Sequence, residues 1–473
     1  MVACAGDGLR RVFYLDLRML ALFRIGLGGV ILIDLVQRSF SFRAHYTQSG
    51  VLPAEEALWF ADFSALLPLH LWFPSDAAQI LFLALQAVAA CALVFGVQTR
   101  MATVVCWLLV NSLQLRNPVL LYGADRELAA VLLWAMFLPL GARWSMDGRQ
   151  RCRWLGVDRV SGWAAAGLIL QVGLIYFTSV LSKSGDTWRD GSAILLALNV
   201  DVYTRSAGRW LLQFGDSLRW LTYGTLLIEC LAPCMLLAGK IERMRWIGCL
   251  TLIAMQCGFL FFLSVGLFPW ISMVALVALI PWRPSTDSVK TNTRLRDGWG
   301  ERLAALFLLM MLFWQIALVP LQSNSSALMG KMPDAMAWVY KVTRLAQSWS
   351  MYSPDPPDRD GWYVLECGAG DIESVDLLQD GAPVEWSKPS SVDCMFLSER
   401  WKEWVLKVQL RGLKWDRTVD YFVREASQQG RIDPTRPGVQ VRLWYLEEAY
   451  DAPEESPSRH MLFEKVFADF DAL

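Results

Sequence analysis

Apolar runs long enough to cross a lipid bilayer are the feature that most restricts how this chain can fold. A helix needs about 20 residues to cross roughly 30 Å of hydrocarbon. In lipid, every backbone polar group must be hydrogen-bonded within its own segment, so such runs predict helices rather than strands. The sequence therefore predicts a multi-pass α-helical membrane protein with about nine transmembrane helices. These runs cover residues 19–36, 78–96, 101–115, 126–142, 161–182, 218–239, 246–266, 268–282 and 303–321.

The composition agrees with a membrane protein. Hydrophobic residues make up 55% of the 473 residues, and the usual share in soluble domains is about 45–50%. The eighth run, 268–282, is short, and Gly266 and Pro269 lie where the chain would turn. A re-entrant hairpin is therefore an alternative to two spans at 246–282, and both arrangements return the chain to the same side.

Basic residues indicate the orientation of the spans. If the N-terminus is cytoplasmic, the inner segments hold roughly twice as many Lys and Arg as the outer loops, as the positive-inside rule requires. The first run starts only after Arg18 and has full span length, so we expect it to remain as a helix rather than be cleaved. We expect a transmembrane domain over 1–282, a polar cytoplasmic linker over 283–302, a final span over 303–321 and an extracytoplasmic α+β domain over 322–473.

The segment after residue 321 is acidic overall, so nucleic acid is an unsuitable partner. Alternating or β-rich stretches predict strands at 362–366, 375–386 and 439–446, with Asp380-Gly381 as a hairpin turn. Apolar residues at helical spacing predict helices at 396–411 and 418–428. This segment contains two cysteines, Cys367 and Cys394. They could form a disulfide or remain free thiols, and the sequence favours neither alternative.

Arg24, Asp34 and Glu229 are charged residues inside predicted spans, where such residues are rare and tend to mark function. Arg24 and Asp34 are in the first span and Glu229 is near the centre of the sixth. Arg24 and Asp34 are separated by about 15 Å along one helix, so we expect each to find its partner on another helix or in a water-filled cavity. Internal pairing and a functional cavity are equal alternatives for all three candidate binding residues.

Polar residues also gather at the predicted outer membrane surface. Asn117, Tyr122, Gly123 and Asp125 lie in the turn between the third and fourth spans. Contact with lipid headgroups and the rim of an outward-facing pocket both explain such a group.

Lys183 ends the fifth span, seven residues after Tyr176 on the same helical face. A lysine at this place commonly extends toward the membrane interface. If it points into an apolar pocket instead, desolvation favours its neutral form, and it becomes a candidate general base.

Histidine is scarce, and this excludes several kinds of site. The chain has 3 histidines, far apart in sequence. They form neither the ligand spacing of a zinc site nor a Ser-His-Asp arrangement. We therefore expect no metal site.

Several blocks of sequence resemble the HTTM domain, the horizontally transferred transmembrane domain shared with the vitamin K-dependent gamma-carboxylases. The blocks occur in the family's order, and the last two resemble a module that follows the spans in bacterial HTTM proteins. They are RIGLGGVILIDLVQR (24–38), HYTQSGVLP (45–53), RNPVLLYGADRELAAVLLWAMFLPLGARWSMDG (116–148), YFTSVLSKSGDTWRDG (176–191), WSMYSPDPPDRDGW (349–362) and ERWKEW (399–404).

The resemblance implies a chemistry for Lys183. In the carboxylases the matching lysine deprotonates reduced vitamin K, and reaction of the resulting anion with O2 gives the strong base that carboxylation of glutamate by CO2 requires. It implies reduced vitamin K or menaquinol as cofactor, membrane lipid as surroundings, and a protein or peptide client outside a bacterial inner membrane. Asn117, Tyr122 and Gly123 match the family's pocket pattern, and Trp188 belongs to its Trp-x-x-Gly motif.

Two positions depart from the carboxylase pattern. Pro118 and Gln256 stand where the carboxylases carry histidine, and neither can replace an imidazole in proton transfer. The sequence thus leaves two functions open: a quinol-dependent lyase-type carboxylase or oxygenase, and a non-enzymatic membrane scaffold or quinone- or lipid-binding protein with an envelope-facing interaction domain.

Overall fold

The structure of the protein is a computed structural model. It describes residues 12–60, 67–238, 241–282, 291–293, 334–345, 347, 349–369, 374–432, 439–450 and 457–467, and the single residues 303, 306, 307, 310 and 314.

Helices form at eight of the nine predicted runs, and the ninth, 303–321, lies mostly outside the described residues. Among the described residues, four helices, α2, α6, α10 and α15, are long and apolar enough to cross a membrane, and α16 is shorter. The protein is therefore a membrane protein, and the nine-span count stays a prediction. The helices are α2 (Leu17–Phe40), α6 (Asp76–Phe95), α7 (Thr99–Arg116), α8 (Gly123–Ala135), α10 (Trp163–Ser182), α14 (Leu218–Leu236), α15 (Glu242–Phe262) and α16 (Phe268–Leu279).

Short helices connect these long ones. Those that follow α2 are α3 (Phe42–Tyr46), α4 (Ala54–Phe60) and α5 (Leu69–Trp72), and η1 (Pro118–Leu120) precedes α8. The others are α9 (Gly148–Arg153), α11 (Asp186–Asp190), α12 (Ala193–Asn199), α13 (Ser206–Leu211) and η2 (Leu212–Ser217).

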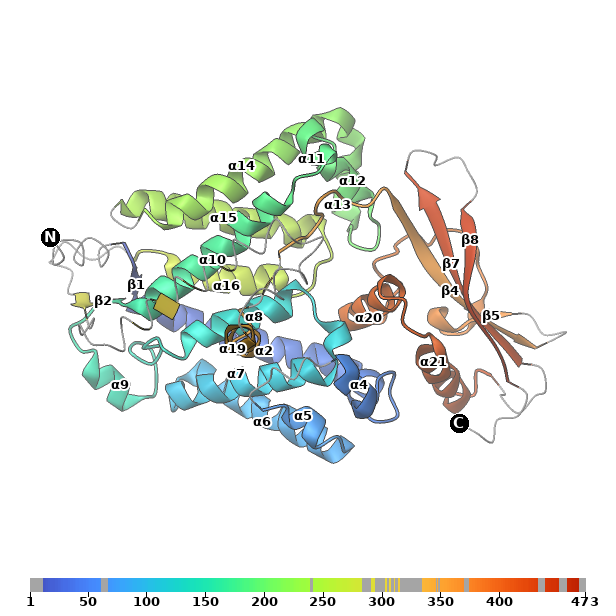
Figure 1. Cartoon of the computed structure of the whole chain (residues 1–473), viewed down its shortest axis with the longest axis horizontal. Coiled ribbons are helices and arrows are strands. Elements are labelled where there is room, and N and C mark those ends of the chain that lie inside the picture. Colours follow the sequence, from blue (N-terminus) through green and yellow to red (C-terminus); the bar gives the residue numbers. More distant parts are fainter. Residues whose placement is uncertain are drawn as a thin grey trace.

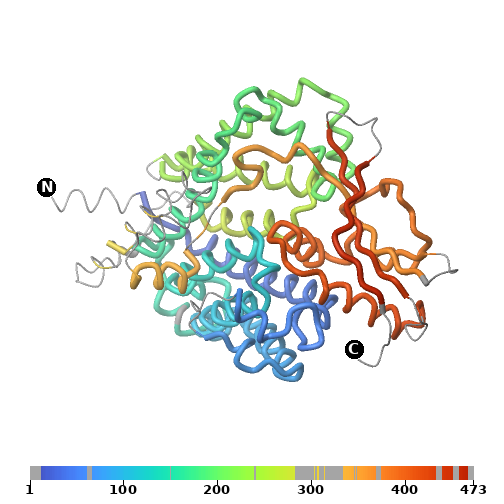
Figure 2. The backbone as a smooth tube through the Cα atoms, turned by 45° about the vertical axis from the view of Figure 1, so that its right-hand side comes forward, coloured from blue at the N-terminus to red at the C-terminus, as the bar shows by residue number. Residues whose placement is uncertain are grey.

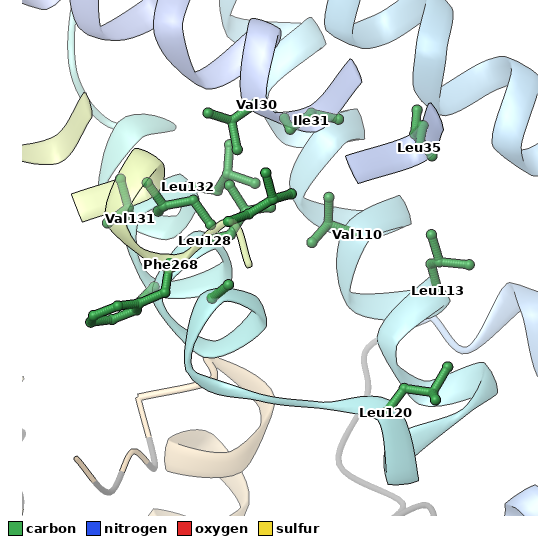
Figure 3. Packing of buried hydrophobic residues seen from close by; sticks show 14 of the residues in the cluster. Val30, Ile31, Leu35, Val110, Leu113, Leu120, Leu128, Val131, Leu132 and Phe268 are labelled. Atoms are coloured by element: carbon green, nitrogen blue, oxygen red, sulfur yellow. The ribbon is translucent and has the colours of Figure 1, made fainter. Parts of the chain in front are cut away.

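Helix α2 lies at the centre of the bundle, between α6 and α16. Gly28 permits this close packing, because a Cβ added there would lie 2.8 Å from the Ala90 carbonyl oxygen on α6. Leucine, isoleucine and valine side chains from α2, α7 and α8 interlock in the interior, and Phe268 at the start of α16 packs beside them (Figure 3). Dense packing of this kind holds the helices in one arrangement and so fixes the polar residues that they carry.

The two ends of the bundle are different. Strands β1 (Tyr14–Asp16), β2 (Arg159–Ser161) and β3 (Thr291–Thr293) form a small sheet near the N-terminus. At the opposite end lies a C-terminal α+β unit, residues 359–467 (Figure 1). The two sheets are therefore separated by the length of the helical bundle.

The C-terminal unit is a five-stranded antiparallel sheet with two helices on one face. Its strands are β4 (Arg359–Ala369), β5 (Val375–Asp376), β6 (Ala382–Pro383), β7 (Val439–Ala449) and β8 (Ser458–Phe467), in the order β6-β5-β4-β7-β8. A 3-10 turn, η4 (Leu377–Gln379), and the positive φ angles of Asp380 and Gly381 join β5 to β6, and this connection is longer than the predicted tight hairpin. Helices α20 (Glu399–Leu410) and α21 (Asp416–Gln428) match the two predicted helices, and β8 was not predicted.

Helix α20 joins the C-terminal unit to the bundle (Figure 1). Ser398 caps its N-terminus by accepting the Trp401 N–H. Lys402 donates to the Ser264 carbonyl at 2.7 Å, and Arg400 donates to the Leu120 carbonyl at 3.2 Å. These carbonyls belong to loops at one end of the bundle, so the C-terminal unit is bound directly to that end.

The chain reaches this unit along the bundle. After α19 (Asp334–Val342), residues 343–345, 347 and 349–355 lie along the helices on the way to the C-terminal sheet (Figure 2). Gln347 accepts from Gln171 of α10 at 3.0 Å, and Arg344 donates to Asn111 of α7 at 3.0 Å. The predicted domain boundary at residue 322 stays a prediction.

Candidate functional site

Lys183 and Glu229 form a buried ion pair inside the bundle. Lys183 follows the last residue of α10, and its Nζ donates to both carboxylate oxygens of Glu229 on α14, at 2.6 and 2.5 Å. The side chains are only 6% and 4% exposed. Lys183 therefore points into the protein rather than toward its surface. It does not stand alone in an apolar pocket, however, since a carboxylate faces it.

The indole of Trp188 forms one wall of this pair. Lys183 Nζ lies 4.7 Å from the centre of the Trp188 ring, which is a favourable contact for a cation. Trp188 is held in turn by a hydrogen bond from its Nε1 to the Tyr352 carbonyl at 2.9 Å. The structure thus brings together three of the residues singled out in the sequence, Lys183, Trp188 and Glu229.

Residues 349–355, which we call the strap, hold the loop that carries Lys183. Ser182 donates to the Trp349 carbonyl at 3.1 Å, and the Gly185 N–H donates to the Pro354 carbonyl at 3.1 Å. Asp355 accepts the Thr187 N–H at 2.9 Å. The strap therefore connects the Lys183 loop to the start of the C-terminal sheet.

A second polar group lies deeper in the bundle. Gln256 of α15 donates to the Tyr176 hydroxyl at 2.9 Å, and Ser272 of α16 donates to Glu127 of α8 at 2.7 Å. All four side chains are buried. Gln256 thus occupies the expected histidine position as a hydrogen-bond donor to Tyr176, and its own Oε1 has no partner among the described residues.

Asp34 and Asp125 belong to a different arrangement, which we call the interdomain charge cluster: Asp34, Arg38, Asp125 and Arg400. Arg38 bonds Asp34 at 2.7 Å and Asp125 at 2.6 Å. Arg400 of α20 bonds the same two carboxylates at 2.7 and 2.6 Å. The expectation that Asp34 needs a partner on another helix was incomplete, because Arg38 one turn later on its own helix also pairs with it.

Arg24 binds the C-terminal end of helix α6. Its guanidinium donates to the carbonyls of Leu93 and Val94 at the end of α6, at 2.6 and 2.8 Å, and to that of Trp144 at 2.5 Å. Gly96 ends α6 with φ +71°, and a Cβ added there would lie 2.5 Å from Arg24 Nη1. A cation at a helix C-terminus stabilises the free carbonyls, so Arg24 closes α6.

Asn117, Tyr122 and Gly123 each contact another segment of the bundle. The Tyr122 hydroxyl accepts the Leu267 N–H at 3.1 Å. A Cβ on Gly123 would lie 3.4 Å from the Phe268 ring. Asn117 donates to the His45 carbonyl at 3.4 Å. Among the described contacts, none joins Asn117 or Tyr122 to Lys183.

The structure brings His45 to Asn117, which sequence reasoning missed. The His45 ring is fully buried and lies 4.6 Å from the centre of the Trp401 ring of α20. Burial, followed by the charges of Arg400 and Arg38, lowers the pKa of His45 to about 3. His45 is therefore a neutral imidazole, and no sequence spacing indicates its position because the contact depends on the docking of α20.

The candidate disulfide is not formed, since Cys367 and Cys394 are both free thiols. Cys367 is buried, and burial raises the pKa of its thiol to about 11. Among the described residues, no group of three or more His, Cys, Asp or Glu side chains is placed to hold a metal ion.

This fold and site define a class: a helical membrane protein with a buried lysine–glutamate pair at one end of its bundle. A family model, the HTTM domain, matches residues 14–282, more than half of the chain. The chain belongs to the HTTM family, which confirms the resemblance drawn from the sequence. No curated protein and no solved structure matches it.

Proposed function

We propose that this HTTM protein is a quinol-dependent carboxylase or oxygenase in which Lys183, paired with Glu229, acts as the base. The buried pair itself carries the proposal. Lys183 donates to both carboxylate oxygens of Glu229, so transfer of one proton to Glu229 would leave a neutral amine that can accept a proton from a substrate hydroxyl. Ionisable residues buried in a membrane domain are rare, and they commonly belong to functional sites.

Two side chains of the bundle suit a reduced vitamin K or menaquinol. Gln256 Oε1 is a buried acceptor without a partner among the described residues, and it can take a hydrogen bond from a quinol hydroxyl. Trp188 offers an aromatic face next to Lys183. When bound, such a quinol supplies, together with O2, the strong base needed before CO2 adds to a glutamate of a protein or peptide client.

Lys183→Ala is expected to lower epoxide formation from a reduced K-type quinone by at least about 100-fold, because it removes the general base. The measurement is product formation by purified full-length protein in lipid. Lys414→Ala, a change at an exposed lysine of the C-terminal unit, is the matched control and should retain activity. Equal turnover in wild type and Lys183→Ala rules out the proposed role.

A non-enzymatic membrane scaffold, or a quinone- or lipid-binding protein, is the second candidate. It is favoured by Pro118 and Gln256, because neither position carries an imidazole. Its expected result is a correctly folded wild type that binds quinone or lipid without forming epoxide, and a cellular role that Lys183→Ala leaves unchanged.

We also propose that the protein spans a bacterial inner membrane nine times, with the N-terminus cytoplasmic and residues 322–473 extracytoplasmic. The arginine asymmetry of the sequence supports this, as does the position of the N-terminal sheet at the end of the bundle opposite the C-terminal unit (Figure 1). A reporter that is active only outside the cytoplasm should be active when fused after Leu473. A reporter active only in the cytoplasm at this position contradicts the topology.

A further inference from the structure

Glu127 is a buried acid that the proposed reaction does not use. It lies in the first half of α8 and is 1% exposed. Among the described residues, no cation lies within ion-pair distance of it, and its bonded neighbour is the Ser272 hydroxyl, at 2.7 Å. An acid in this setting is rare in membrane domains and characteristic of proton paths.

The hydrogen bonds around Glu127 have a defined direction. The Gln256 amide nitrogen can only donate, so the Tyr176 oxygen accepts and keeps its own proton to donate. The Tyr176 hydroxyl interacts with Ser272, which donates to Glu127. Four helices, α8, α10, α15 and α16, thus bring these side chains into one buried polar group beside Glu127.

Helix α10 relates this polar group to the Lys183–Glu229 pair. Tyr176 precedes Lys183 by seven residues, which is about two turns of helix α10, on the same face. The charge of Glu229 acts on the Tyr176 hydroxyl, as does that of Glu127. Tyr176 is therefore within electrostatic range of both carboxylates, which belong to different helices.

We propose that Glu127 is a second acid–base group of the membrane domain, which holds the proton that leaves the Lys183–Glu229 pair. The inference rests on the proposed function of that pair. No hydrogen bond joins Lys183 to Tyr176 among the described contacts, so the proposed path includes water between them. An N–H bond of Lys183 breaks and its proton passes through this water to the Tyr176 oxygen, while the Tyr176 proton moves to Ser272 and the Ser272 proton moves to Glu127. One N–H bond is lost, one O–H bond forms on Glu127, and Tyr176 and Ser272 end as they began.

The first test does not depend on any turnover. Infrared spectra of the full-length protein in lipid nanodiscs are recorded across a pH titration, and the wild type is expected to show a carboxylic acid band that changes with pH. Glu127→Gln should remove this band, and Ser272→Ala should shift it because a hydrogen bond to the acid is lost. Glu55→Gln, at an exposed acid of α4, is the control and should leave the band in place. A Glu127→Gln spectrum identical to that of wild type overturns the proposal.

The second test uses quinol turnover. Ser272→Ala preserves Glu127 and interrupts the proposed path, so it is expected to lower turnover roughly 100-fold while the quinol concentration for half-maximal rate stays unchanged. Wild-type turnover in Ser272→Ala overturns the relay. If wild type itself forms no epoxide, the proposed function of Lys183 fails, and the infrared titration alone then decides whether Glu127 exchanges protons.

Discussion

Arg400→Ala is expected to lower the free energy of unfolding by about 3–5 kcal/mol, because it leaves buried carboxylates without one of their two cations. Arg400 is 2% exposed and bonds Asp34 and Asp125, which the variant would leave to share Arg38. Thermal unfolding in detergent measures the loss. Limited proteolysis should also show earlier release of the C-terminal unit, since α20 carries Arg400.

Lys414→Ala again provides the control, because Lys414 is exposed and lies beyond the end of α20. Its unfolding temperature and proteolysis pattern should match those of wild type. If Arg400→Ala behaves like Lys414→Ala, the interdomain charge cluster does not hold the C-terminal unit to the bundle, and the docking depends on apolar contacts alone.

The connection between the two parts of the chain extends to the candidate site. The strap leads from the bundle to β4 and holds the loop of Lys183 through Ser182, Gly185 and Thr187. Movement of the C-terminal unit would therefore be transmitted to Lys183 through the backbone of the strap and its hydrogen bonds to the Lys183 loop. Damage at the interdomain charge cluster and damage at the lysine pair are expected to be coupled for this reason.

Much of the local structure could be predicted because local signals determine it. Apolar runs of span length indicated the helices. Asp380-Gly381 indicated a turn, and both residues adopt positive φ between β5 and β6, but η4 makes this connection longer than the predicted tight hairpin. Alternation over 439–446 indicated β7, and helical spacing indicated α20 and α21. Strand β8 escaped prediction because its residues, SRHMLFEKVF, alternate poorly and only its pairing with β7 makes it a strand.

The partners of the buried charges could not be predicted in the same way. Glu229 lies 46 positions from Lys183, and Arg400 lies 366 positions from Asp34. Sequence indicated that each charge needs a partner, because an unpaired ion in lipid is costly, but many charges satisfy that condition. Which charge becomes the partner depends on how the helices pack and on where α20 docks. Both are features of the tertiary structure.

Lys183 and Glu229 offer a way to separate stability from chemistry. Glu229→Met alone leaves a buried ammonium without its carboxylate, so we expect the free energy of unfolding to fall by about 3–5 kcal/mol. The double variant Lys183→Met with Glu229→Met replaces the pair by apolar side chains of similar size, and this exchange is often neutral or stabilising. The double variant should therefore recover the thermal stability of wild type in lipid or detergent.

Recovered stability without recovered turnover is the result that assigns the pair a chemical role. The double variant keeps the fold but has neither amine nor carboxylate, so epoxide formation should stay at the level of Lys183→Ala. Since both proteins are measured side by side, misfolding cannot explain the missing activity. A double variant as unstable as Glu229→Met would show that the pair is needed for packing, and a double variant with wild-type turnover would remove Lys183 from the mechanism.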